Sequence, residues 1–131
     1  MFIHIDSQSE IPIYAQLTNQ IIEGIARGYL LPGDSLPSVR AFAADLSVNM
    51  HTVHKSYQAL ERKGIIRLVP KSGAVICKDD SFDKATHYER LRSMMQPVVA
   101  EAVVLGMKED EIQEMLQSIL KHMQKENQRG D

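Results

Sequence analysis

The sequence predicts a mostly α fold with a small β-wing, and three observations lead to that prediction. Between residues 36 and 64, two short helical patterns are separated by a tight turn. Two short β-runs joined by Pro-Lys-Ser-Gly come next. After a polar stretch at 78–81, two longer helical patterns fill most of the remaining chain. We therefore expect two domains in the 131 residues, one at 1–78 and one at 79–131.

The first helix is expected over about 12–27. Residues 2–6 before it alternate apolar and polar side chains, which is typical of a short strand or an extended arm. Pro12 suits a first helical position, and Gly28 suits a helix end. Apolar side chains recur at helical spacing between them, at Tyr14, Leu17, Ile21 and Ile25.

The next two helices form a helix-turn-helix. Ser38 is a good N-cap for the first of them, because its hydroxyl can accept from a free backbone N–H. Residues 47–48 form the turn, and Asn49 can cap the second helix, which ends at Arg62 or Lys63 before Gly64. The buried stripe of the first helix is expected to be Val39, Phe42, Ala43 and Leu46.

The second of these helices has two different faces. Its apolar face consists of Val53, Tyr57 and Leu60. Its other face carries Met50, His51, His54, Lys55 and Gln58. A helix that packs on one side and presents polar side chains on the other is what the major groove of DNA admits.

The β-wing follows this helix. Its strands are expected at 65–69 and 74–77, with the tip at 70–73 and Lys71 pointing outward. Residues 34–78 carry seven basic and three acidic side chains, a net charge of +4, although the whole chain has −2. Residues 79–131 carry seven basic and eleven acidic side chains, a net charge of −4. This asymmetry gives the middle of the chain a modest attraction for phosphate.

The remaining residues predict a helical hairpin. One helix is expected over about 82–105, bent at Pro97 and ended by Gly106, and the other over about 108–126 before a frayed tail. The apolar stripe of the last helix is too wide to face water, so a second copy of the chain is its natural cover. The residues expected at that dimer contact are Leu91, Met95, Val98, Val99, Ala102, Ile112, Met115, Leu116, Ile119 and Met123.

Several motifs at fixed spacing resemble the DNA-binding domain of the GntR family of bacterial transcription regulators. They are Pro32-Gly33-Asp34, Leu36-Pro37-Ser38-Val39-Arg40, Val48-Asn49-x-x-Thr52-Val53 and Leu60-Glu61-x-x-Gly64. The resemblance runs from about residue 11 to residue 77. The short C-terminal part is similar to the YtrA subfamily, in which this part serves chiefly for dimerisation.

The resemblance implies an N-terminal winged helix-turn-helix that contacts DNA through residues of both helices and the wing. Arg40 would contact DNA from the first of the paired helices, Ser38 and Thr52 would touch phosphate, and Gly73 would let the wing tip approach the minor groove. The full set of expected DNA contacts is Ser38, Arg40, Asn49, Met50, His51, Thr52, His54, Lys55, Lys71 and Gly73.

Met50 departs from the family pattern. Many members have an arginine there that reads guanine, and many relatives of this shape have proline. Methionine cannot donate a hydrogen bond, so Met50 either packs against a thymine methyl group or contributes little. From the residues alone, Arg40 has a plainer alternative, which is a surface ion pair with Asp45 or Glu61.

The sequence gives little support for a membrane protein, a secreted protein or an enzyme. The apolar runs are too short to span a membrane, no secretion signal is visible, and the lone Cys77 fits a reducing cytoplasm. No enzyme motif stands out, and His51 and His54 lack a third metal ligand, so we expect neither enzyme activity nor a metal or cofactor. The predicted function is that of a cytoplasmic, homodimeric, sequence-specific double-stranded-DNA-binding regulator, which represses transcription from a palindromic operator.

Two alternatives remain open. In the first, the winged helix is a protein-interaction module that docks through the methionine-rich C-terminal helices. In the second, a DNA-binding regulator also holds a small effector between those helices, which contain Met94, Met95, Met115 and Met123.

Overall fold

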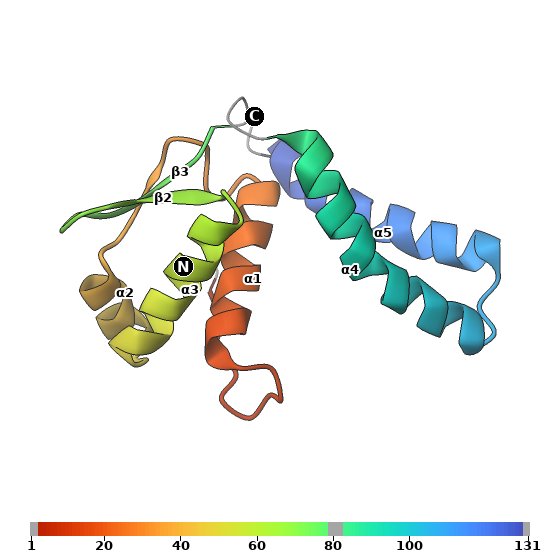
Figure 1. Cartoon of the computed structure of the whole chain (residues 1–131), viewed down its shortest axis with the longest axis horizontal. Coiled ribbons are helices and arrows are strands. Elements are labelled where there is room, and N and C mark those ends of the chain that lie inside the picture. The colour runs from red at the N-terminus through yellow and green to blue at the C-terminus, as the bar shows by residue number, and fades with distance from the viewer. Residues whose placement is uncertain (1–2, 79–82, 130–131) are drawn as a thin grey trace.

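The computed structural model describes residues 3–78 and 83–129, with side chains described as far as residue 123. Its elements confirm the predicted mostly α fold with a small wing (Figure 1). In chain order they are α1 (Ile13–Ala26), β1 (Ser35–Leu36), α2 (Val39–Leu46), α3 (Met50–Arg62), β2 (Ile66–Val69), β3 (Gly73–Ile76), α4 (Lys84–Val104) and α5 (Glu109–Arg129).

The core lies between α1, α2, α3 and one face of the small sheet. Its largest fully buried side chain is Tyr57, whose ring lies 6.2 Å from that of Phe42. The Tyr57 hydroxyl donates a 2.7 Å hydrogen bond to the Pro37 carbonyl, so this ring also fixes the start of α2. Burial raises the pKa of Tyr57. The buried apolar cluster consists of Leu17, Ile21, Leu36, Phe42, Ala43, Val53, Tyr57, Leu60, Ile66, Ala74 and Ile76.

The sheet has three antiparallel strands in the order β1-β3-β2. The hairpin of β2 and β3 was predicted, within one residue at each boundary. The strand β1 was not predicted, because two residues show no period. It forms through pairing of Ser35 with Val75 and of Leu36 with Ala74. The third strand is therefore a product of tertiary contact.

The N-terminal segment is an extended arm rather than a strand. The Gln20 side-chain amide accepts from the His4 N–H at 2.7 Å and donates to the His4 carbonyl at 2.6 Å. The Gln16 amide pairs with Asp6 in the same way, at 2.8 and 2.9 Å. Two glutamines one turn apart on α1 thus supply the hydrogen bonds that a neighbouring strand would supply. The predicted segment began at Phe2, which lies outside the described residues.

The two C-terminal helices extend away from the core (Figure 1). Pro97 lies within α4 and does not end it. The second helix, α5, continues to Arg129, so the prediction of a frayed tail from residue 125 was wrong in length. Most of the polar stretch predicted as a hinge lies outside the described residues. No helix among residues 3–78 and 83–129 is both long and apolar enough to cross a membrane.

Candidate nucleic-acid interface

The exposed face of α3 includes four of the residues that the sequence predicted to contact DNA. His51, His54 and Lys55 are exposed, and Met50 keeps 45% of its surface accessible. The opposite face contains Val53 and two further residues that are fully buried, so α3 cannot rotate about its axis without exposing core side chains. The polar face is therefore fixed outward.

The start of α3 is organised by Asn49. Its side-chain oxygen accepts from the His51 N–H at 2.7 Å, which confirms the predicted N-cap. The amide nitrogen of Asn49 keeps its two donors, and Asn49 is itself exposed. The half-buried Thr52 lies in the first turn beyond this cap.

The start of α2 is capped in the same way by Ser38. The Ser38 Oγ accepts from the Ala41 N–H at 3.2 Å, and its hydroxyl proton remains available to an acceptor such as phosphate. Arg40 is exposed in the first turn, and among the described residues its guanidinium forms no ion pair with Asp45 or Glu61. The plainer interpretation of Arg40 is thus not the arrangement observed.

Pro37 brings the predicted contact elements together. Its carbonyl accepts the Tyr57 hydrogen bond from α3, and its backbone lies directly against Gly73, where β3 begins beside the wing tip. A Cβ placed on Gly73 would lie 2.4 Å from the Leu36 carbonyl oxygen and 2.8 Å from that of Pro37. Gly73 is therefore required where the wing meets the start of α2, a reason for this glycine that sequence analysis missed.

The wing tip is a tight turn that presents Lys71. The Ser72 N–H donates to the Val69 carbonyl at 3.0 Å, with Pro70 and Lys71 as the central residues. Lys71 has φ of 67°, a left-handed conformation that an L-residue with a side chain adopts at some cost. Glycine would remove this strain. Lys71 is exposed at this position, so the turn holds a solvent-accessible cation at the end of the wing.

Lys55 has a partner that the sequence did not reveal. Its ammonium nitrogen lies 4.1 Å from the centroid of the Tyr14 ring on α1. This distance is typical of a cation–π interaction. Lys55 remains exposed, so it faces outward from α3 while the ring of α1 restricts its direction. Residues 41 positions apart in sequence give no local signal of such a contact.

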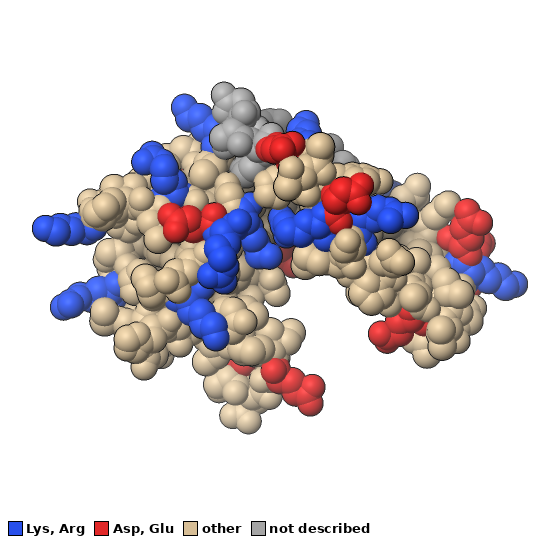
Figure 2. All heavy atoms as spheres, viewed as in Figure 1, with Lys and Arg blue, Asp and Glu red and all other residues tan. Residues whose placement is uncertain are grey.

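The charges follow the same geometry. α2 and the wing tip lie on the side of the molecule away from α4 and α5 (Figure 1). Several Lys and Arg side chains project from that side, and Asp and Glu side chains lie both on the core and near the far end of the helical hairpin (Figure 2). Within the part of the chain that the structure describes, no three His, Cys, Asp or Glu side chains are placed to hold a metal ion.

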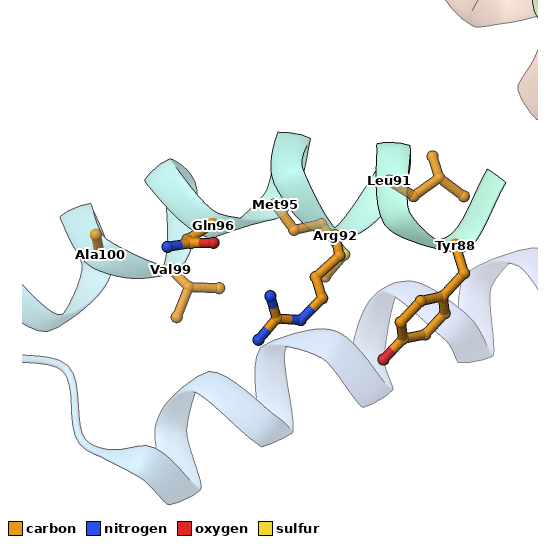
Figure 3. Close-up of a pocket in the computed structure, with 7 residues that line it drawn as sticks. All are labelled: Tyr88, Leu91, Arg92, Met95, Gln96, Val99 and Ala100. Carbon is orange, nitrogen blue, oxygen red and sulfur yellow. The ribbon is translucent and has the colours of Figure 1, made fainter. Parts of the chain in front are cut away.

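A second surface of interest is formed by α4 and α5. An apolar groove of about 660 Å³ runs along α4 between Tyr88 and Ala100. In Figure 3, Tyr88, Arg92 and Val99 project from α4 toward α5. Leu91, Met95, Leu116 and Ile119 each keep roughly half of their surface exposed, so both α4 and α5 leave large apolar side chains uncovered.

The structure places the other residues of the predicted dimer contact as follows. Ala102 is only 6% exposed, so its side chain already contacts its own chain and offers little to a partner. Ile112 and Met123 are half-buried. The exposed members are Leu91, Met95, Val98, Val99, Met115, Leu116 and Ile119.

Comparison with known proteins gives a consistent result. Residues 13–76 match the family described as bacterial regulatory proteins, gntR family. The chain is 38% identical over 114 residues to the uncharacterized HTH-type transcriptional regulator YhcF of Bacillus subtilis, covering 86% of this chain and 90% of YhcF. It is 33% identical over 121 residues to the HTH-type transcriptional repressor YtrA of the same organism, covering 89% and 91% of the two chains.

The likeness extends to the three-dimensional structure. A crystal structure described as a transcriptional antiterminator from Listeria monocytogenes EGD-e superposes with a TM-score of 0.84 at 31% sequence identity. The match covers 94% of this chain and 92% of that one. The similarity therefore includes the C-terminal helices as well as the helix-turn-helix and wing.

Proposed function

From the premise that this chain belongs to the GntR family and is a DNA-binding transcription regulator, we propose that it is a repressor that binds a palindromic operator as a homodimer. The observation that carries the proposal is the juxtaposition of three outward-facing elements. The start of α2, the polar face of α3 and the wing tip are joined through Pro37, which contacts both Tyr57 and Gly73.

In this proposal α3 lies in the major groove, with Met50, His51 and His54 toward base edges. Met50 supplies apolar contact suited to a thymine methyl group. Arg40 and Lys55 contact base or phosphate from the flanks of the helix-turn-helix. Backbone contacts provide most of the affinity, and α3 provides the choice of sequence.

The phosphate contacts are assigned to groups whose donors remain available. Ser38 keeps its hydroxyl proton after capping α2, and Asn49 keeps its amide N–H groups after capping α3. Thr52 lies beside the Asn49 cap. Lys71, with Gly73 two residues later, places the wing along the neighbouring minor groove, where the strained tip presents its cation.

Homodimerisation is proposed from the uncovered apolar face of α4 and α5. Monomeric soluble proteins seldom leave so continuous an apolar surface in water. A partner copy would contact the exposed side chains of both helices and hold two α3 helices at a fixed separation. Two-fold symmetry then implies an operator with two inverted half-sites about one helical turn apart. Repression follows where such a site overlaps a promoter, and the similarity to the repressor YtrA supports this direction of regulation.

The proposal is tested by selecting duplexes from random DNA with the full chain. Affinities for the selected duplex and a scrambled duplex are then compared by fluorescence anisotropy at several salt concentrations. We expect enrichment of an inverted repeat. Arg40→Ala should weaken binding to the selected duplex by about 1–3 kcal/mol if the side chain reads a base.

The matched control is Lys108→Ala, which removes one positive charge at the far end of the hairpin. It should leave both affinities unchanged. Equal affinity of the wild-type chain for selected and scrambled duplexes would contradict sequence-specific binding. A selected duplex without inverted symmetry would contradict the dimeric operator.

A further inference from the structure

A second, polar pocket lies where α1, α3 and α4 meet. Its volume is about 420 Å³, within the usual range for pockets that hold small molecules. We call it the junction pocket. The side chains that matter for its chemistry are Tyr14, Thr18 and Asn19 of α1, Arg62 and Lys63 at the end of α3, and Arg90 of α4.

The junction pocket has three cations and no acidic side chain in its lining. The two terminal nitrogens of Arg90 contact His87 and Met94, one lying 3.1 Å from His87 Nδ1 and the other 3.8 Å from Met94 Sδ, and no carboxylate among the described residues pairs with this guanidinium. Neither Arg62 nor Lys63 forms an ion pair with a carboxylate within the described ranges. In Figure 2, basic side chains gather where the core meets the C-terminal helices. Like charges held together in this way favour a bound anion.

The donors suit a phosphoryl group in particular. Arginine presents a planar fork that binds phosphate oxygens through two parallel hydrogen bonds, and here two arginines approach from different helices. Lys63 adds a third cation, and Asn19 adds an amide donor. Thr18 is already committed, because its hydroxyl bonds the Tyr14 carbonyl at 2.7 Å and Ser56 Oγ at 2.8 Å.

This pocket is separate from the proposed DNA interface. Arg62 ends α3, whereas Met50 begins it, and twelve residues of α-helix span about 18 Å. An anion in the pocket therefore does not occupy the groove-facing end of α3. Tyr14 connects the pocket to the proposed DNA interface. It lines the pocket, and the Lys55 ammonium group lies over its ring.

We propose that the junction pocket binds a small phosphorylated metabolite, which acts as an effector. The ligand would bridge Arg62 and Lys63 of α3 to Arg90 of α4, and so fix the winged domain relative to the C-terminal helices. Contact with Tyr14 would also change how firmly Lys55 is held. The regulatory consequence rests on the function proposed above, whereas the binding site itself does not.

The test uses the full chain without DNA and inorganic phosphate as the probe. Backbone amide resonances are followed by NMR during titration with phosphate, against sodium chloride at equal ionic strength. We expect saturable shifts at Asn19, Lys63 and Arg90 with phosphate only. Arg62→Gln and Arg90→Gln should each weaken binding at least about threefold, since each removes one charge-assisted contact. Arg67→Gln, an exposed arginine on β2, is the matched control and should leave binding unchanged.

Shifts that do not saturate, that appear equally with chloride, or that persist in both pocket variants would overturn the proposal. A second arm measures duplex affinity of Arg90→Gln in phosphate-free buffer, where we expect the wild-type value. If duplex affinity falls as much as phosphate affinity, the pocket contacts the DNA backbone and the metabolite proposal is wrong. Saturable phosphate binding by a chain that shows no sequence-specific DNA binding would refute the function proposed above and leave this site standing.

Discussion

At the scale of single residues, side chains that carry no charge decide where the charged ones lie. Pro37 contributes only a carbonyl and a backbone, yet α3 and the wing both contact it. Tyr57 fills the core and ends in a hydroxyl that reaches this carbonyl, which fixes α3 to the start of α2. Gly73 lets the wing approach because no Cβ intervenes. The charged residues proposed to contact DNA thus depend on uncharged neighbours for their position.

The glycine at which the wing meets the Leu36–Pro37 backbone gives a prediction. Gly73→Ala should destabilise the fold by at least about 2 kcal/mol, because its Cβ would meet backbone atoms of Leu36 and Pro37 that cannot move independently. The measurement is urea unfolding followed by circular dichroism.

Gly33→Ala is the matched control for this measurement. Gly33 has φ of +92°, close to the +91° of Gly73, but its Cβ would meet only the flexible Lys78 side chain at 3.9 Å. It should cost about 1 kcal/mol from backbone conformation alone. If both variants lose the same free energy of unfolding, the close backbone approach at Gly73 does not contribute to the cost.

At the scale of elements, each helix or strand of the winged domain is fixed by contacts on one face and free on the other. α3 buries one side completely and leaves its polar side exposed. The wing hairpin contacts α3 through β2, and its Gly73 lies against the Leu36–Pro37 backbone before α2. The extended arm is held to α1 by the amides of Gln16 and Gln20. These attachments explain why the exposed faces keep a defined direction.

A substitution at the wing tip is expected to affect DNA affinity without reducing the stability of the fold. Lys71→Gly should leave the free energy of unfolding unchanged or raise it by up to about 1 kcal/mol, because glycine adopts the positive φ without strain. The same change should weaken binding to selected and scrambled duplexes about equally and lower the salt slope by about one, as expected for a phosphate contact. Anisotropy titrations at several salt concentrations measure both. Ser72→Gly, the neighbouring exposed tip residue, is the control, and unchanged affinity in Lys71→Gly would exclude Lys71 as a contact.

At the scale of the whole molecule, the winged domain has a buried core and the C-terminal helices do not. In α4 only Ala102 is fully buried, and apolar side chains of both helices face outward. A single chain leaves that surface uncovered, so the hydrophobic effect favours association. The spacing of two recognition helices would then be set by residues far from DNA.

A double variant of α5 tests this arrangement. Leu116→Glu with Ile119→Glu should convert the dimer to a folded monomer, because both side chains are about half exposed and a partner would have to bury two charges. Size-exclusion chromatography with light scattering measures the mass, and circular dichroism checks the fold. Gln117→Glu, also exposed on α5, should leave the mass unchanged. A monomeric wild-type chain at micromolar concentration would refute the dimer.

The sequence by itself determined the elements whose signals are local. Ser38 and Asn49 are capping residues recognisable one at a time, the periodic burial of Val53, Tyr57 and Leu60 defines α3, and Pro70 with Gly73 marks the wing turn. The motif spacing identified the family, because many positions had to agree at once. The GntR resemblance therefore depends on the sequence alone.

Only the tertiary structure decided what depends on residues distant in sequence. The strand β1 exists because Leu36 meets Ala74, and Lys55 is directed by a ring on α1. The junction pocket needs three helices to bring its cations together, and the burial of Ala102 removes it from a surface where its helical period had placed it. Periodicity reports which side of an element is apolar, whereas only the packed chain determines which other element covers that side.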